Sequence, residues 1–262
     1  MATNPYPRSI FGLIGKRLNY SFSRAYFSEK FERAGLDDHE YRNFEIEDVD
    51  GLLRFRESVK YDPQSRTTND KNEIIRGLNV TIPYKEAVME ILDEVSEEAQ
   101  TIGAVNTIVI EDNLWTGHNT DAYGFAKSLT PFLPLAKNAL ILGTGGASKA
   151  VGYVLESMQV PYLLVSRKPQ GDFQISYDQV REVLGDVELI VNTTPLGTHP
   201  DTNQAPALPY ELLNKSHILY DLVYNPANTL FMKKGARNGA RVINGLEMLR
   251  WQAERAWELW NK

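Results

Sequence analysis

Short apolar runs alternate with longer stretches of helical periodicity along the first half of the chain. The runs predict strands, because a buried strand is apolar over about four to eight residues and is bounded by turn residues. The predicted strands are residues 9–15, 40–46, 77–82, 107–110 and 114–116, the last two forming a hairpin. Helical spacing predicts a helix at 22–34 that ends at Gly35, and Pro83 is predicted to begin a helix that reaches Val95. This alternation predicts an α/β layer built largely from crossover units.

The second half of the chain repeats the pattern after two interrupting prolines, Pro131 and Pro134. Its apolar runs are shorter and almost unbroken, which is typical of strands buried on both faces of a parallel sheet. The predicted strands are residues 138–142, 162–165, 189–191, 218–222 and 241–243. Five such strands separated mostly by helical segments predict an open doubly wound sheet. An amphipathic helix rich in tryptophan is predicted at 247–262.

Composition excludes several classes of function. The 262 residues carry a formal net charge of -6, which argues against a nucleic-acid or anionic-membrane surface. The absence of cysteine excludes disulfides, thiolate nucleophiles and cysteine-ligated metals. The four histidines show no metal-ligand spacing, and no apolar run is long enough to span a bilayer. We therefore expect a metal-free cytoplasmic protein with no membrane or nucleic-acid partner.

A glycine-rich segment follows the predicted strand that ends at Leu142. It reads Gly143-Thr144-Gly145-Gly146-Ala147 and leads into a helix. Glycine lets the backbone turn sharply and approach a pyrophosphate, which then meets free N–H groups at the helix N-terminus. A tight turn without a ligand is the alternative. The order strand, glycines, helix and second strand favours a dinucleotide site.

The second of these strands ends in Ser166-Arg167-Lys168. Sites for NAD usually place an acidic residue here, whereas two cations and a hydroxyl suit the 2′-phosphate of NADP. A solvated turn with two charges is the alternative interpretation. The sequence thus predicts NADP as the cofactor, bound by a Rossmann-type doubly wound domain at residues 123–244. The other predicted domain is an N-terminal α/β domain at residues 1–122.

Eight short motifs in order along the chain resemble those of the shikimate dehydrogenase family. Besides the glycine loop and the Ser21-x-Ser23 pair, they are residues 77–85 (GLNVTIPYK), 103–107 (GAVNT), 117–121 (GHNTD), 192–197 (NTTPLG), 220–226 (YDLVYNP) and 245–253 (GLEMLRWQA). Together they run from about residue 21 to residue 253, nearly the whole chain.

The resemblance implies reversible NADP-dependent reduction of 3-dehydroshikimate to shikimate, in the pathway to chorismate and the aromatic amino acids. It implies an acid/base role for Lys85, with Asp121 beside it. The implied substrate-binding residues are Ser21, Ser23, Thr81, Asn106, Tyr224 and Gln252. Because the two serines and Gln252 lie at opposite ends of the chain, the resemblance also implies a substrate-binding domain at residues 1–122 completed by the C-terminal helix at 245–262. The implied cofactor-binding residues are Gly143, Thr144, Gly145, Gly146, Ala147, Ser166, Arg167, Lys168, Val223, Gly245 and Met248.

The residues themselves suit this chemistry. Reduction of a ketone needs a hydride donor and a proton donor for the developing alkoxide. Hydroxyl and amide side chains discriminate polyhydroxylated acids, because a wrong ligand leaves them unpaired. Each candidate also has an ordinary structural interpretation: a solvated lysine at Lys85, a turn and helix cap at 119–121, and local backbone bonding at Asn106.

The sequence departs from the family pattern near the first serines. Where the family usually has proline and histidine around the two serines, this chain has Arg17, Tyr20, Arg24 and Phe27. Two other functions stay open, a quinate or quinate/shikimate dehydrogenase that uses NAD, and a non-catalytic NADP-sensing module. The expected partners are small-molecule reactants only, with the protein acting as a monomer or homodimer.

Overall fold

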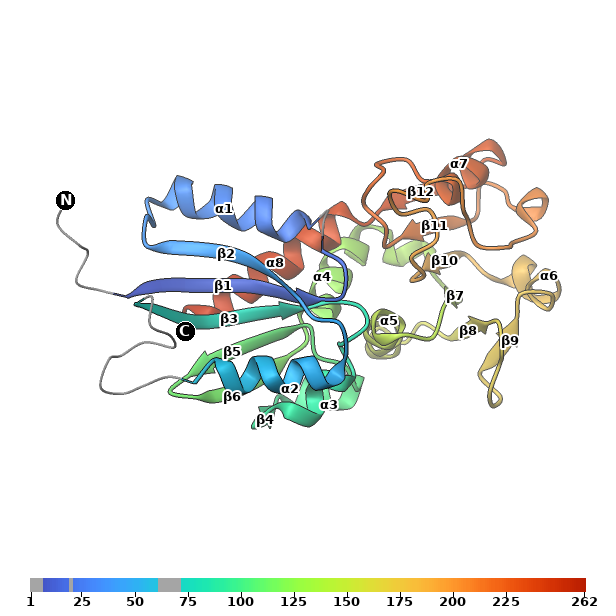
Figure 1. The fold of residues 1–262 in the computed structure, drawn as a ribbon. Helices are drawn as coiled ribbons and strands as arrows, with labels where there is room; N and C mark the ends of the chain where they lie inside the picture. Colours follow the sequence, from blue (N-terminus) through green and yellow to red (C-terminus); the bar gives the residue numbers. More distant parts are fainter. Residues whose placement is uncertain (1–6, 19–20, 61–71) are drawn as a thin grey trace. The chain divides into compact units, whose positions relative to one another are not determined.

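The structure is a computed structural model that describes residues 7–18, 21–60 and 72–262. The chain divides into two compact units, the first made of residues 1–120 and 255–262 and the second of residues 121–254 (Figure 1). The last helix, α8 (Leu246–Trp260), therefore begins in the second unit and ends in the first. We propose that residues 1–122 and 245–262 bind the substrate and that residues 123–244 bind NADP. None of the helices in the described ranges is both long and apolar enough to cross a bilayer.

The first unit contains a mixed sheet of six strands in the order β2-β1-β3-β5-β6-β4. Strand β1 runs parallel to β2 and β3, whereas β5 runs antiparallel to β3 and β6. The strands are β1 (Arg8–Gly15), β2 (His39–Glu45), β3 (Glu73–Val80), β4 (Glu94–Val95), β5 (Thr107–Glu111) and β6 (Leu114–His118). The predicted strands and hairpin of this half are therefore present.

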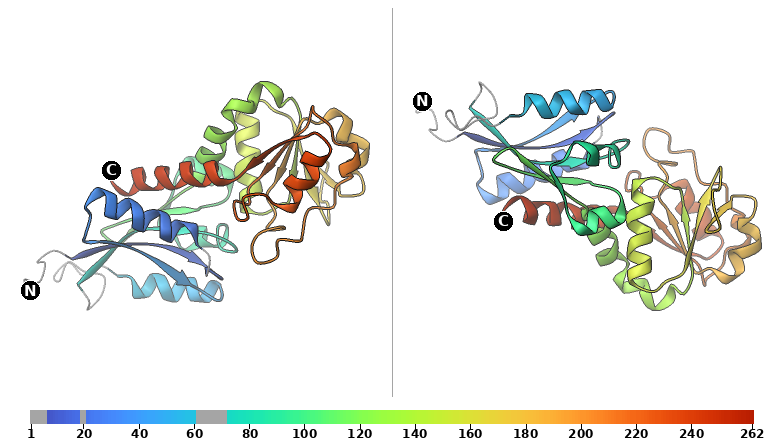
Figure 2. Two further views of the ribbon diagram at one scale, coloured as in Figure 1. Left: turned by 90° about the horizontal axis from the view of Figure 1, so that it is seen from above. Right: turned by 90° about the horizontal axis from the view of Figure 1, so that it is seen from below.

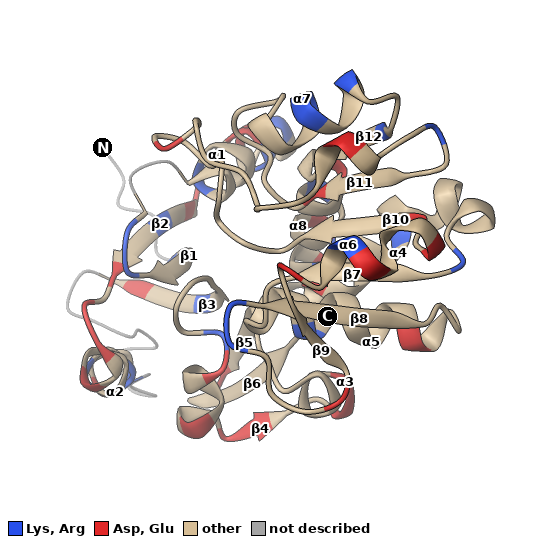
Figure 3. Cartoon of the chain, turned by 90° about the vertical axis from the view of Figure 1, so that its right-hand side faces the viewer, with Lys and Arg blue, Asp and Glu red and all other residues tan. Residues whose placement is uncertain are grey.

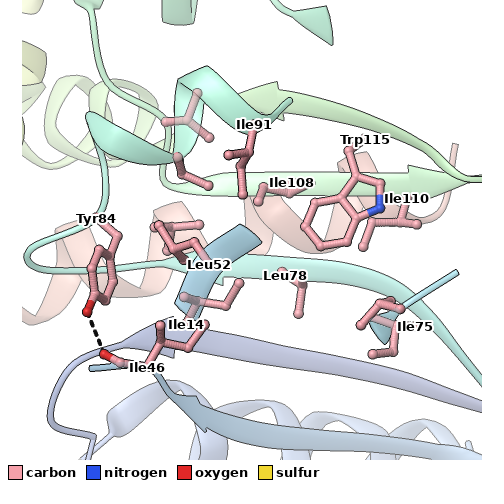
Figure 4. Close-up of a cluster of buried hydrophobic side chains, with 14 of the residues drawn as sticks. Ile14, Ile46, Leu52, Ile75, Leu78, Tyr84, Ile91, Ile108, Ile110 and Trp115 are labelled. Carbon is pink, nitrogen blue, oxygen red and sulfur yellow. Dashed lines mark hydrogen bonds between the residues drawn. The ribbon is translucent and has the colours of Figure 1, made fainter. Parts of the chain in front are cut away.

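One face of this sheet is covered by α2 (Val49–Ser58) and by η1 (Ala87–Ile91), a short 3-10 helix. Aliphatic side chains from the sheet, including Ile14, Leu78 and Ile108, are buried against Leu52 and Ile91 (Figure 4). Tyr84 inserts into the same cluster and donates its hydroxyl to the main-chain oxygen of Ile46.

The opposite face is aromatic. Figure 2 shows α1 (Phe22–Ala34) and the C-terminal part of α8 on this side of the sheet, with α2 on the other. The ring of Trp260 lies 5.0 Å from that of Phe11 and 5.2 Å from that of Phe27, and Phe27 stacks on Tyr41 at 4.8 Å. Gly77 allows this packing, because a Cβ there would lie 2.2 Å from the Trp260 indole nitrogen.

The second unit contains a wholly parallel sheet in the order β12-β11-β10-β7-β8-β9. Its strands are β7 (Ala139–Leu142), β8 (Tyr162–Ser166), β9 (Gln174–Ser176), β10 (Leu189–Asn192), β11 (Ile218–Asp221) and β12 (Arg241–Asn244). The order reverses at β7, which is the arrangement of a doubly wound dinucleotide-binding sheet. The predicted fold class, an α/β substrate domain plus a Rossmann-type sheet, is confirmed.

Helices cover both faces of the second sheet. On one face, α7 (Leu230–Arg237), α6 (Val180–Val183) and the 3-10 helix η4 (Tyr210–Leu212) pack against Leu140, Leu142 and Leu219. On the other face, Phe125 of α4 (Thr120–Leu129) packs edge-on against Tyr220 at 5.1 Å. Two 3-10 segments, η2 (Thr130–Leu135) and η3 (Leu184–Asp186), complete the connections together with α5 (Gly146–Ser157).

The predicted helix at 83–95 is wrong. The chain there forms turns, then η1, then β4. A continuous α-helix would bond the Lys85 oxygen to the N–H of Met89, but that oxygen accepts from Val105 N at 2.7 Å and Met89 N donates to Glu86 instead. Val88 and Ile91, three positions apart, lie on the same side of the 3-10 helix and are both buried. The apolar spacing that predicted an α-helix therefore also fits a 3-10 helix. The sequence pattern also did not predict α2, β4 or β9.

Charged side chains gather on particular elements within each unit (Figure 3). In the first unit, β4 and α3 (Glu97–Ile102) carry exposed acidic residues, among them Glu94 and Glu97. In the second unit, α7 carries the basic residues Lys233 and Arg237, both exposed. Their charges lie in solvent, and the apolar sides of both helices complete the cores.

Candidate functional site

Three of the predicted substrate and acid/base residues meet at one edge of the first sheet. The carboxyl end of β3 lies beside the amino end of the antiparallel β5, with Asn79 paired to Thr107. Val80 N donates to the Asn106 oxygen at 2.8 Å, and Val105 N donates to the Lys85 oxygen at 2.7 Å. These bonds hold the backbone at Thr81, Lys85 and Asn106 together. The Lys85 side chain is half-buried and Asn106 is buried.

The Asn106 side chain is bonded to the start of α4. Thr120 N donates to Asn106 Oδ1 at 2.6 Å, and Asn106 Nδ2 donates to Thr120 Oγ1 at 3.0 Å. Asp121 follows Thr120 directly, is buried, and is the first residue of the second unit. The first turn of a helix is a favourable place for a carboxylate.

The two predicted serines lie at the start of α1. Ser21 is the N-cap, and its hydroxyl oxygen accepts from Arg24 N at 3.4 Å. Ser23 is buried in the first turn. Leu18, which precedes them, is hydrogen-bonded to β2. Its N–H donates to Glu45 Oε1 at 2.8 Å, and its main-chain oxygen accepts from Asn43 Nδ2 at 2.9 Å.

The departures from the family pattern near these serines have different surroundings. Phe27 is fully buried between Tyr41 and Trp260, so this residue belongs to the aromatic core. Arg24 is exposed on α1, and Arg17 is exposed before it. Tyr20 lies outside the described residues.

The glycine loop of the second unit joins β7 to α5. Gly143 has φ +114°, in the region that favours glycine, and a Cβ on it would lie 2.7 Å from Thr193 Oγ1. Gly145 is the N-cap of α5 with no side-chain cap, and a Cβ on it would meet nothing within 4 Å. Thr144, Gly146 and Ala147 complete the turn and open the helix. A helix N-terminus without a side-chain cap, beside an open space at Gly145, fits a pyrophosphate.

The residues predicted to select NADP lie at the carboxyl end of β8. Ser166 ends the strand, and its hydroxyl oxygen accepts from Lys168 N at 3.1 Å. Arg167 and Lys168 are exposed. Burial raises the pKa of Tyr177, and the Arg167 charge partly offsets this shift, so the guanidinium lies within electrostatic range of that ring. Because all six strands are parallel, this loop and the glycine loop lie at the same edge of the sheet.

Three polar residues at this edge were missed by the sequence prediction. Asn192, Asp221 and Asn244 are the last residues of β10, β11 and β12, and the strand register pairs each with the next. The sequence signal was present, because each ends an apolar strand at its carboxyl edge, where α/β sheets bind their ligands.

Asp221 organises the loop that follows β11. It is fully buried, and its carboxylate accepts from Asn192 Nδ2 at 2.9 Å, Val223 N at 3.1 Å and Thr229 Oγ1 at 2.6 Å. Burial raises the pKa of Asp221 to about 6 despite these three donors. The backbone of Val223, a predicted cofactor-binding residue, is therefore fixed by its hydrogen bond to the Asp221 carboxylate.

The remaining predicted residues lie around β12 and α8. Asn244 Nδ2 donates to the Tyr224 oxygen at 3.3 Å, and Gly245 must be small because a Cβ would lie 2.3 Å from the Leu222 oxygen. Met248 and Gln252 are buried on α8, where Gly124 of α4 approaches them closely. Gln252 Nε2 donates to the Leu249 oxygen at 3.0 Å.

Each unit thus assembles one set of candidates. The first brings together Thr81, Lys85 and Asn106, and the second brings the glycine loop to the same edge as Arg167, Val223 and Gly245. Among residues 7–18, 21–60 and 72–262, no group of three or more His, Asp or Glu side chains could hold a metal ion.

Comparisons with known proteins cover nearly the whole chain. A family model described as the shikimate dehydrogenase substrate binding domain matches residues 13–108. The chain is 39% identical over 263 residues to the shikimate dehydrogenase (NADP(+)) of Clostridium beijerinckii, covering 96% of this chain and 92% of that protein.

Solved structures are similar over the same extent. Shikimate 5-dehydrogenase of Thermus thermophilus, in complex with NADP(H) and shikimate, has a TM-score of 0.80 and 34% identity, covering 96% of this chain and 92% of that one. Quinate dehydrogenase of Corynebacterium glutamicum, in complex with NAD, has a TM-score of 0.80 and 28% identity, covering 97% and 93%.

Proposed function

The chain belongs to the shikimate dehydrogenase family, and on that premise we propose that it catalyses the reversible NADP-dependent reduction of 3-dehydroshikimate to shikimate, a step toward chorismate and the aromatic amino acids. The observation that carries the proposal is the similarity, over 96% of the chain, to the shikimate dehydrogenase (NADP(+)) of Clostridium beijerinckii. The enzyme works in the cytoplasm on two small-molecule reactants, as a monomer or homodimer.

The second unit binds the cofactor in this proposal. NADPH, when bound, supplies the hydride that reduces the ketone. The N–H groups at the start of α5 would hold its pyrophosphate, and the glycines of the loop that begins at Gly143 and ends at Ala147 place no side chain against it. Val223, Gly245 and Met248 bind the remainder of the cofactor. Support comes from the N-cap of α5, which has no side-chain partner, and from the open space at Gly145.

The preference for NADP over NAD depends on the end of β8. Arg167 and Lys168 neutralise the 2′-phosphate, and the Ser166 hydroxyl stands beside them. The planar guanidinium can donate two parallel hydrogen bonds to phosphate oxygens, which a ribose hydroxyl cannot accept in the same way.

Lys85 is the acid/base residue. As hydride reaches the ketone carbon, negative charge builds on the ketone oxygen, and the Lys85 ammonium stabilises this charge and donates a proton from Nζ. In the oxidative direction the neutral amine accepts the hydroxyl proton. Asp121, as a carboxylate, orients the lysine and stabilises its charged form. Support comes from the two motifs in which these residues stand.

The substrate is held by neutral hydrogen-bonding groups. These are the hydroxyls of Ser21, Ser23, Thr81 and Tyr224 and the amides of Asn106 and Gln252. A polyhydroxylated acid pairs with such groups, and an analogue that lacks a hydroxyl leaves a buried partner unsatisfied. The first sheet supports this role, because Asn106 and Thr81 are held at one edge by main-chain bonds.

Initial rates with the purified protein test the proposal. Shikimate and quinate are each offered with NADP+ and with NAD+, and turnover of shikimate with NADP+ is expected to be fastest. Faster turnover of quinate with NAD+ would favour the second candidate function, which the similarity to the Corynebacterium glutamicum quinate dehydrogenase supports. NADPH binding without turnover of either acid would indicate a sensing module.

A further inference from the structure

Five buried polar side chains form a hydrogen-bonded network in the first unit. The Tyr41 hydroxyl donates to Asn79 Oδ1 at 2.8 Å, and Asn79 Nδ2 donates to Thr107 Oγ1 at 3.2 Å. Thr107 Oγ1 lies 3.2 Å from Asn106 Oδ1 and 3.0 Å from Thr120 Oγ1. Each of the five residues is at most 4% exposed. We call these five residues the amide network.

Asn79 can take only one orientation of its amide in this network. Its Nδ2 lies 3.4 Å from the main-chain oxygen of Asn106, and a carbonyl oxygen can only accept. The opposite orientation would set two acceptors against each other in a buried place, where an unmade hydrogen bond is costly. Oδ1 of Asn79 therefore faces Tyr41, and the Tyr41 hydroxyl must donate.

Asn106 is oriented by a second main-chain group, the N–H of Thr120. This group can only donate, and it lies 2.6 Å from Asn106 Oδ1. The amide oxygen must therefore face Thr120, and Thr107 is within reach of the same oxygen. One N–H of Asn106 Nδ2 donates to Thr120 Oγ1 at 3.0 Å. The nitrogen side of the amide therefore carries donors and no acceptor toward a bound molecule.

Tyr41 is the end of the network on β2. Burial raises the pKa of Tyr41, and the nearby Ser23 side chain partly offsets the rise. The hydroxyl thus stays protonated at neutral pH and can always donate to Asn79. Phe27 stacks on the Tyr41 ring at 4.8 Å, which fixes the ring plane. Tyr41 and Asn106, a predicted substrate ligand, are therefore joined through Asn79 and Thr107 by a chain of buried hydrogen-bonding groups.

The sheet does not require these polar groups for its stability. Main-chain bonds between β3 and β5 already pair residues 77–79 with residues 107–109. Apolar side chains at positions 41, 79 and 107 would fill the same volume without the cost of burying hydroxyl and amide groups. A fully paired polar network instead fixes a single arrangement of its members.

We propose that Tyr41 and Thr107 are positioning residues for the Asn106 amide. Thr107 contacts Asn106 Oδ1 directly, and Tyr41 acts on Thr107 through Asn79, so that the amide keeps the orientation that binds the substrate. The inference rests on the proposed function, in which Asn106 binds shikimate. A hydroxyl or alkoxide oxygen of that substrate accepts from the Asn106 N–H, and the network prevents the amide from turning its oxygen toward it.

The test uses Tyr41→Phe and Thr107→Val in the full-length protein. Each change removes one hydroxyl at nearly constant shape. The KM for shikimate and its Kd from calorimetry should each rise about 3- to 10-fold, as expected for one lost buried hydrogen bond. The Kd for NADPH should not change, because its proposed ligands lie in the second unit. The double variant should show less than the product of the two single effects.

Two matched variants separate positioning from general destabilisation. Thr107→Ser keeps the hydroxyl and should restore shikimate binding. Tyr210→Phe removes a buried tyrosine hydroxyl that donates to the Pro206 oxygen at 2.9 Å in the second unit, and it should leave shikimate binding as in the wild type. If Tyr41→Phe does not fold, the Thr107→Val and Thr107→Ser pair decides the question.

The outcomes distinguish this inference from the proposed function. Folded Tyr41→Phe and Thr107→Val variants with unchanged shikimate affinity would overturn the inference, and so would an equal loss of shikimate and NADPH affinity. Wild-type protein that binds shikimate without oxidising it would contradict the proposed function, while the binding comparison would still decide the inference. A wild-type protein that does not bind shikimate would overturn both.

Discussion

The indole Nε1–H of Trp260 donates to the main-chain oxygen of Ile108 at 2.9 Å, across 152 positions of sequence. The Trp260 ring also occupies the space above Gly77, where a Cβ would lie 2.2 Å from its nitrogen. One side chain near the end of α8 therefore completes both the hydrogen bonding and the packing of the aromatic face of the first sheet.

Replacing Trp260 should destabilise the first unit. Trp260→Ala removes a large buried ring and should lower the free energy of unfolding by about 3–5 kcal/mol, whereas Trp260→Phe should cost roughly 1–3 kcal/mol for the lost hydrogen bond and volume. Urea unfolding followed by circular dichroism measures both. Trp251, which is 40% exposed, provides the control, and a comparable loss in Trp251→Ala would contradict the role given to Trp260.

Loss of the acid/base residues should slow turnover without weakening cofactor binding. Lys85→Ala and Asp121→Asn should each lower kcat by about 10²- to 10⁴-fold, the range for general acid–base catalysis. The double variant should lose much less than the product, since the two residues act as a unit. Lys60→Ala removes an exposed lysine of the same unit and should be silent. Near-normal turnover in a folded Lys85→Ala variant would refute the assignment.

The two glycines of the loop after β7 should respond differently to alanine. Gly143→Ala forces a side chain into φ +114° and against Thr193, so it should reduce stability by about 1–3 kcal/mol and weaken NADPH binding as well. Gly145→Ala has open space around its Cβ, so stability should stay unchanged while NADPH binding weakens. Thermal melts and fluorescence titration separate the two effects. Normal NADPH affinity in Gly145→Ala would exclude a pyrophosphate at this position.

Arg167 should discriminate between the two nicotinamide cofactors. Arg167→Ala should weaken NADPH binding by about 1.5–3 kcal/mol, the scale of a charge-assisted hydrogen bond, and leave NADH binding nearly unchanged. Arg181→Ala is a suitable control, because Arg181 is an exposed arginine of the same unit paired with Glu211. Equal losses for both cofactors in Arg167→Ala would show that this residue does not contact the 2′-phosphate.

Asp221 should make stability depend on pH. Its pKa is raised to about 6 in the folded protein, from an ordinary value of 3.8. The folded state therefore binds the proton more tightly, and the resulting stabilisation is present below pH 3.8 and lost as the pH rises through about 6. Two pKa units correspond to roughly 3 kcal/mol at most.

The variant Asp221→Asn removes this contribution. The stability of Asp221→Asn relative to the wild type should therefore increase between about pH 4 and pH 7, by up to roughly 3 kcal/mol. Urea unfolding at several pH values measures this difference. A stability difference between the two proteins that does not vary with pH would show that the pKa of Asp221 is not raised.

Local patterns predicted most strands, α1, α5 and the glycine loop, because apolar runs and glycines encode these features within a few residues. The segment after Pro83 was predicted wrongly for a non-local reason. The Lys85 oxygen accepts a hydrogen bond from Val105 N, and the Tyr84 hydroxyl donates to the Ile46 oxygen in the core. These distant contacts favour a 3-10 helix at Val88 and Ile91 in place of the α-helix that their spacing predicted.

The site shows the same limit. Lys85, Asn79, Asn106 and Asp221 all stand in recognisable motifs, but a motif does not say which distant residue each one contacts. Tyr41 stands in no motif. Tyr41 meets Asn79 across 38 positions, and Asn192 meets Asp221 across 29. Asn192 and Asp221 meet through the register of the adjacent strands β10 and β11, whereas Tyr41 on β2 reaches Asn79 on β3 across the intervening β1. Both relationships depend on the order and register of a whole sheet.

The division of α8 between the two units also determines which unit can be completed first during synthesis. A ribosome makes residues 1–120 first, yet the part of the aromatic face that α8 covers stays exposed until residues 255–260 have emerged. By then all of residues 121–254 have been made. The unit that begins first is thus the last to be completed on the ribosome. Through that interval the nascent chain exposes the part of the aromatic cluster that Trp260 later covers, Phe11 and Tyr41 of the sheet and Phe27 of α1, to which a chaperone can bind.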